Sequence, residues 1–71
     1  KNYDEAEKVL KHMMELRPIS EEITANFGNL YTLRGNYDEA ERWFRKALEI
    51  NPNHAYSREM LQNLDRLRRG F

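Results

Sequence analysis

The hexapeptide NYDEAE at residues 36–41 decides the fold, because residues 2–7 of the same chain repeat it letter for letter. The two copies are 34 residues apart, and the same register pairs Glu15 with Glu49. Repeats of this length are typical of solenoids, in which each supersecondary unit buries its apolar face only by stacking on the next. Such a chain presents a surface to a partner and is not expected to carry out chemistry of its own.

The composition excludes several other classes of protein. Twelve Lys and Arg balance twelve Asp and Glu among the 71 residues, so no global field attracts nucleic acid or an anionic membrane. The chain has no Cys, which excludes a disulfide framework, thiol catalysis and a cysteine metal site, and which favours the cytoplasm as an expectation only. No apolar run approaches the roughly 18 residues that a membrane helix needs. The start at Lys1, midway through a repeat, suggests a fragment.

Caps and breakers predict four helices and no strand. The first runs from Tyr3 to Leu16, with Asn2 and Glu5 as a capping box and Pro18 as the stop. The second follows the N-cap Ser20 and stops at Gly35, where a left-handed turn commonly closes a helix. The third begins with a second capping box formed by Asn36 and Glu39, and it halts before Pro52. The fourth starts after Asn53 or His54 and ends at Gly70. Short loops make successive helices antiparallel neighbours.

Apolar residues recur at spacings of three and four in each helix, which places them on one face. On this basis we expect the second helix to bury Ile23, Phe27, Leu30, Tyr31 and Leu33. Trp43 and Phe44 are adjacent and cannot face the same way, so Phe44 is expected in the core and Trp43 against a neighbouring helix.

These residues resemble the tetratricopeptide repeat, a helix–turn–helix unit of 34 residues with the pattern W-x2-L-G-x2-Y…A-x3-F…P. The pattern fits residues 21–54, where Thr24 takes the tryptophan place and Phe27 the leucine. The remaining signature positions match outright: Gly28, Tyr31, Ala40, Phe44 and Pro52. The small Gly28 and Ala40 are expected to let two antiparallel helices approach closely.

The resemblance implies an all-α, short right-handed solenoid of four helices in a single domain. Residues 1–20 are similar to the second helix of a truncated repeat, residues 21–54 to a full repeat, and residues 55–71 to a capping helix. Arg58, Gln62 and Asp65 replace three signature residues in the last helix, which removes a docking face for a further helix. Met13 stands where the full repeat has Ala47, so that contact is bulkier.

In this family the first helix of each unit lines a concave groove that binds peptides. Carried over to this chain, the resemblance implies a groove faced by the second and fourth helices, whose asparagines form a short polar ladder that can both donate and accept hydrogen bonds. The alternative is a solvated surface without a ligand. The candidate groove residues are Glu22, Asn26, Asn29, Leu33, Tyr56, Met60 and Asn63, with Ala25, Glu59 and Leu67 beside them.

Three residues of the first helix lack the partner that the repeat pattern gives them: Ala6, Leu10 and Met13. Burying each large side chain is worth about 1.5–3 kcal/mol, so we expect the chain to self-associate as a homo-oligomer, by exchange of helices between copies.

The main hypothesis is a non-enzymatic scaffold that binds a peptide or helix of a protein partner. The alternatives are a structural, self-assembling fragment and a substrate-holding accessory domain of a larger enzyme such as a glycosyltransferase.

No catalytic, cofactor or metal residues are predicted. His12 and His54 are isolated, and the twin acids at helix starts are explained by capping. A cluster of three cations, Arg66, Arg68 and Arg69, lies at the end of the last predicted helix. The negative C-terminal end of the helix dipole explains it better than nucleic-acid binding does, because the chain has no net charge.

Overall fold

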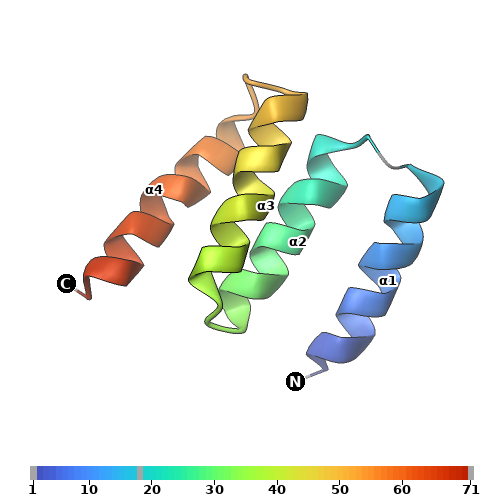
Figure 1. Ribbon diagram of the computed structural model, residues 1–71, viewed down its shortest axis with the longest axis horizontal. Helices are drawn as coiled ribbons and strands as arrows, with labels where there is room; N and C mark the ends of the chain where they lie inside the picture. Colours follow the sequence, from blue (N-terminus) through green and yellow to red (C-terminus); the bar gives the residue numbers. More distant parts are fainter. Residues whose placement is uncertain (1, 18, 71) are drawn as a thin grey trace.

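Four helices make up the fold, and Figure 1 shows them side by side in chain order. The computed structural model describes residues 2–17 and 19–70, and within them no strand occurs. The molecule is a thin slab with extents of 38 × 31 × 14 Å. The predicted all-α architecture of four helices is confirmed. The helices are α1 (Tyr3–Leu16), α2 (Glu21–Leu33), α3 (Tyr37–Ile50) and α4 (Ala55–Arg69).

The helix ends follow the local chemistry of the sequence at most positions. The Asn2 carboxamide oxygen accepts the Glu5 backbone N–H at 3.1 Å, which is one half of the expected capping box. The Ser20 hydroxyl accepts the Ile23 N–H at 3.3 Å, so Ser20 caps α2 as predicted. Gly35 and Gly70 have positive φ angles of 80° and 67°, the left-handed conformation expected of both glycines. The predicted stop at Pro18 lies outside the described residues.

The capping box predicted for α3 is wrong, because the expected hydrogen bond to the Asn36 side chain does not form. Asn36 is the N-cap residue, but its side chain caps no backbone N–H. Its backbone N–H instead donates to the Tyr31 carbonyl at 2.8 Å, and the Gly35 N–H donates to Thr32 at 3.0 Å. This pair of bonds is a Schellman closure of α2. Asn36 therefore ends one helix while it starts the next.

The core lies between α2 and α3, where the backbones approach most closely. A Cβ atom built on Gly28 would lie 2.6 Å from the Phe44 ring, closer than any real contact. Only glycine at this position lets Phe44 lie against the α2 backbone, as expected from the sequence. Ala40, Phe44 and Ala47 are all 0% exposed, so this face of α3 is completely covered.

Trp43, next to Phe44 in the chain, packs against α2. Its ring stacks on Phe27 of α2 with centroids 4.4 Å apart and an interplanar angle of 17°. Lys46 lies over the indole at 5.6 Å. The predicted contact of Trp43 with a neighbouring helix is confirmed, and the stack extends the α2–α3 interface.

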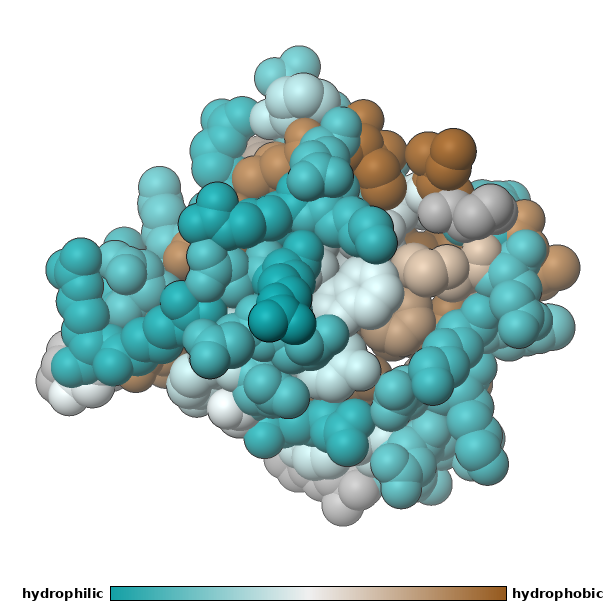
Figure 2. All heavy atoms as spheres, in the orientation of Figure 1, coloured by the Kyte–Doolittle hydropathy of each residue, from teal (hydrophilic) through white to brown (hydrophobic). Residues whose placement is uncertain are grey.

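The outer helices are much less enclosed. In α4 only Ser57 and Leu64 are buried, and in α1 no residue is. Leu33 is 67% exposed, so its predicted burial in α2 is wrong: it is the last residue of the helix, and the buried residues of α2 end at Leu30. Figure 2 shows hydrophobic surface gathered in the upper part and along the right edge, toward α1 and the start of α2, while most of the remaining face is hydrophilic.

Candidate functional site

The candidate groove residues lie on α2 and α4 and are largely accessible. Leu33 is 67% and Tyr56 41% exposed. Glu22 and Asn26 are also exposed, whereas Asn29, Met60 and Asn63 are half-buried. Ala25, at 2% exposure, belongs to the core beneath them.

A side-chain hydrogen bond joins the two helices of this surface. The Tyr56 hydroxyl of α4 donates to the Asn29 carboxamide oxygen of α2. The Tyr56 ring also meets the edge of Phe44 at 6.3 Å, so it is anchored from below. α2 and α4 therefore touch across the end of the core.

The three asparagines expected as a ladder have different surroundings. Asn29 accepts from Tyr56, whereas Asn63 donates to the Met60 sulfur at 3.8 Å and accepts from Arg66 at 3.3 Å. Asn26 lies instead beside α1. Two of the three amides thus have partners within the chain and only part of their hydrogen-bonding capacity left for a ligand.

The exposed end of the surface opens into a hollow between α1 and α2, which we call the α1–α2 cleft. It has a volume of about 410 Å³ and combines apolar side chains with one cation and one carboxylate. The cleft is lined by Met13, Leu16, Arg17, Ser20, Glu22, Ile23 and Asn26. It brings two of the predicted groove residues together with Met13, a predicted self-association residue.

The three self-association candidates lie on α1. Ala6 is exposed, Leu10 half-buried and Met13 40% exposed. Val9, at 52%, and Leu16, at 70%, extend the same open surface.

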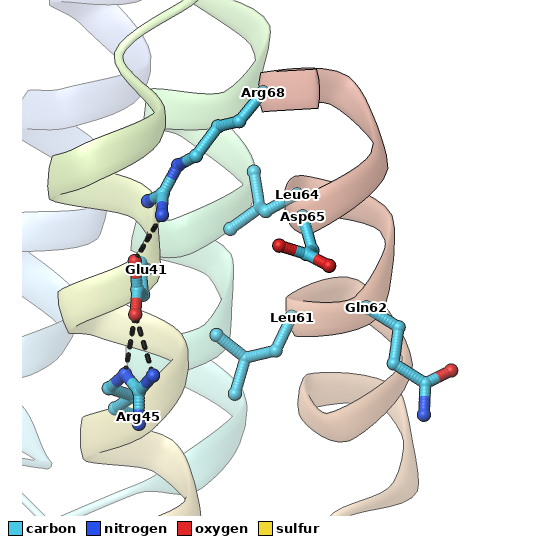
Figure 3. A pocket seen from close by; sticks show the side chains of 7 residues that line it. All are labelled: Glu41, Arg45, Leu61, Gln62, Leu64, Asp65 and Arg68. Carbon is cyan, nitrogen blue, oxygen red and sulfur yellow. Dashed lines mark hydrogen bonds and ion pairs between the residues drawn. The ribbon is translucent and has the colours of Figure 1, made fainter. Parts of the chain in front are cut away.

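An ion network fastens α4 to α3 (Figure 3). The Glu41 carboxylate lies between two guanidinium groups, that of Arg45 at 2.7 Å and that of Arg68 at 2.6 Å. Arg68 also contacts Asp38 at 3.3 Å and donates to the Tyr37 carbonyl at 2.9 Å. Hydrogen bonds from Arg45 and Arg68 lower the pKa of Glu41 below its ordinary value.

The same network recurs between α1 and α2, one repeat earlier. Glu7 contacts Lys11 at 3.4 Å and Arg34 at 3.1 Å, and the Tyr31 hydroxyl donates to it at 3.3 Å. Burial raises the pKa of Glu7, but the bonds from Arg34, Lys11 and Tyr31 outweigh burial and lower it. Burial and the nearby Glu7 raise the pKa of Tyr31.

Sequence reasoning missed both networks, although the signal was present. Glu7 and Arg34 are 27 residues apart, and so are Glu41 and Arg68 one repeat later. The repeat therefore conserves a bond between neighbouring units as well as the units themselves.

A model of the tetratricopeptide repeat matches residues 1–64. The chain belongs to the tetratricopeptide repeat family. No curated protein matches it. Tetratricopeptide repeats generally mediate protein–protein interactions and are typically non-enzymatic scaffolds, so a protein partner is indicated. In the described residues of this tetratricopeptide repeat chain, no helix is both long and apolar enough to cross a membrane.

The arginine cluster near the end of this tetratricopeptide chain is engaged within the protein. Arg68 lies in the Glu41 network, Arg69 contacts Asp65 at 3.0 Å, and Arg66 donates to Asn63. His54 likewise has an internal partner, the Ser57 hydroxyl at 2.7 Å. These contacts engage the arginines and His54 in hydrogen bonds and ion pairs within the protein.

Proposed function

We propose that this protein is a non-enzymatic scaffold that binds an extended peptide or a helix of a protein partner along α2 and α4. The observation that carries the proposal is the hydrogen bond between Tyr56 and Asn29. This bond joins one candidate residue of α2 to one of α4, which supports a surface shared by the two helices.

The chemistry of that surface suits a peptide. Leu33, Met60 and the Tyr56 ring offer apolar contacts, and the amides of Asn29 and Asn63 contact Tyr56 and Met60. An extended backbone has alternating N–H and C=O groups, which asparagine side chains can satisfy in both senses. The proposal includes the division of the single domain into a truncated repeat at residues 1–20, a full repeat at 21–54 and a capping helix at 55–71, which contains α4.

The test is a selection of peptides from a displayed random library against the full 71-residue chain. Selected peptides should shift the amide NMR signals of Leu33, Tyr56 and Met60. The substitutions Asn29→Ala and Met60→Ala should each weaken binding by about fivefold to tenfold, the loss expected for one hydrogen bond or one apolar contact.

His12→Ala is the matched control, because His12 is exposed on α1 and no proposed contact involves it. Binding that is equally strong in all three variants, with helicity retained, would overturn the groove. A selection without binders would do the same.

A further inference from the structure

The indole N–H of Trp43 is a buried donor without an acceptor. Within residues 2–17 and 19–70, Trp43 Nε1 is the one buried side-chain nitrogen or oxygen that makes no hydrogen bond. The N–H of a buried Trp normally finds a partner, because an unsatisfied buried donor costs free energy. The stack on Phe27 fixes the place of the ring but supplies no acceptor for its N–H.

Trp43 lines an open cavity of about 300 Å³, which we call the Trp43 cavity. All of its lining residues belong to α3: Glu39, Arg42, Trp43, Lys46 and Glu49. None of them is a candidate groove residue. Because α3 packs against both α2 and α4, the cavity lies within the full repeat and not at either end of the array.

One cation of the Trp43 cavity has no ionic partner in the described part of the chain. Arg42 is paired with Glu39 at 3.3 Å. Lys46 is exposed, and its ammonium lies 5.6 Å from the centroid of the Trp43 ring, but it forms no ion pair with a described residue. The cavity therefore has an ammonium and an indole N–H at the same ring, and both are donors that need an acceptor.

We propose that the Trp43 cavity is a second binding site, which takes a carboxylate side chain from an acidic segment of a protein partner. The carboxylate accepts a hydrogen bond from Trp43 Nε1 and pairs with Lys46. Because Nε1 is covered in the free chain, the exposed Lys46 side chain must shift when the carboxylate enters. The exposed carboxylate of Glu49 on the rim disfavours further negative charge, so the cavity suits spaced carboxylates better than the continuous charge of a nucleic-acid backbone.

The internal repeat shows that this site is particular to α3. The counterpart of Trp43, 34 residues earlier on α1, is Val9, and the counterpart of Lys46 is His12. Arg42 corresponds to Lys8, which is an exposed cation. α1 therefore keeps a cation but lacks the indole donor, and Lys8 serves as a control of equal charge in the same molecule.

The probe is a hexapeptide of alternating Ala and Glu, blocked at both ends and titrated to about 10 mM into the full, isotope-labelled chain. The chain has a single Trp, so the indole N–H gives one signal in the NMR spectrum. This signal should move downfield and saturate, because the N–H gains an acceptor. The charge-reversed peptide of alternating Ala and Lys should leave the signal in place.

Two substitutions should weaken binding, as measured from the backbone amide shifts of α3. Trp43→Phe removes the donor and keeps an aromatic ring against Phe27, so binding should weaken about threefold to tenfold, the loss of one charge-assisted hydrogen bond. Lys46→Gln should weaken binding about threefold to fivefold, the loss of an exposed ion pair.

Three further variants test the specificity of the site. Lys8→Gln removes the same charge from α1 and should leave binding within about 1.5-fold. Glu49→Gln removes a repulsion and should strengthen binding about twofold. Asn29→Ala changes the proposed groove and should leave binding of the acidic peptide intact, which separates this site from the groove. Circular dichroism confirms that each variant keeps its helicity.

Four results would overturn the proposal. The first is an indole signal that does not move up to about 10 mM peptide, and the second is binding that Trp43→Phe leaves unchanged. The third is an equal loss from Lys8→Gln and Lys46→Gln, which would indicate unspecific attraction of charge. The fourth is an oligothymidylate that moves the indole signal at a lower concentration than the peptide does, because nucleic-acid phosphate would then be the better ligand.

Discussion

α1 and α3 begin with the same six residues, yet one helix is open and the other is enclosed. Ala40, Phe44 and Ala47 of α3 are 0% exposed, while α1 has no buried residue. The helices have similar lengths and the same internal ion pair, from Glu7 to Lys11 and from Glu41 to Arg45. The difference therefore comes from their neighbours: α3 packs against both α2 and α4, whereas the extensive contacts of α1 are with α2.

The comparison also separates two kinds of contact. The ion networks of Glu7 and Glu41 are nearly the same at both places, because each joins a helix to the one that follows it. The apolar contacts differ, because they need a helix on the other side. In a stacked repeat, polar bonds thus set the register between units, and apolar burial supplies most of the stability.

The largest expected difference between the two helices is at Phe44 and its counterpart Leu10. Phe44→Ala should lower the free energy of unfolding by about 3–5 kcal/mol, because it leaves a cavity against Gly28. Leu10→Ala should cost less than about 2 kcal/mol, since Leu10 is only half-buried. Urea denaturation of both variants measures the two values. Equal losses would contradict the contrast between an enclosed and an open helix.

The next largest effect is expected at Gly28. Gly28→Val should destabilise the protein by about 1–3 kcal/mol, because its Cβ would have to displace the Phe44 ring. Gln62→Val, at the equivalent position one repeat later, changes an exposed residue and should stay within about 0.5 kcal/mol. Thermal melts of the pair check this. A stable Gly28→Val protein would show that α2 and α3 do not need this close approach.

Much of this arrangement was predictable from the sequence, because the deciding signals are local. The repeat, Ser20, Gly35 and Pro52 fix the helix boundaries, and Gly28 with Phe44 identifies the core contact. The exposure of Leu33 was not predictable, because a periodic apolar residue at a helix end has the same pattern whether a neighbour covers it or not. The hydrogen bond between Tyr56 and Asn29 was not predictable either, because it depends on how α2 and α4 approach each other across α3.

A smaller effect is expected from the arginines of the two networks. Arg68→Gln and Arg34→Gln should each cost up to about 1 kcal/mol, because both side chains are partly exposed and water screens their ion pairs. The two costs should agree within about 0.5 kcal/mol if the networks are equivalent. Denaturant titration measures them, with Arg42→Gln as the control at an ion pair within one helix. A large loss at only one of the two arginines would show that the networks differ.

The pH dependence of folding stability should reflect the ion networks of Glu7 and Glu41 together. The pKa of Glu7 and that of Glu41 are lowered from 4.5 in the folded protein, so near that pH the unfolded chain binds more protons. The stability that these carboxylates contribute is therefore fully present above pH 4.5 and is lost as the pH falls through their lowered pKa values. Melting temperatures recorded from about pH 7 down to about pH 3 should fall. The double variant Glu7→Gln, Glu41→Gln should show a shallower decline, and an unchanged slope would contradict this origin.

The most direct test of the contrast between α1 and α3 is native-state amide hydrogen exchange followed by NMR. The amides in the middle of α2 and α3 should exchange only through global unfolding, whereas those of α1 should exchange faster, through separate opening of that helix. Equal protection of α1 and α3 would contradict the account, because the exposed helix would then be as firmly held as the enclosed one.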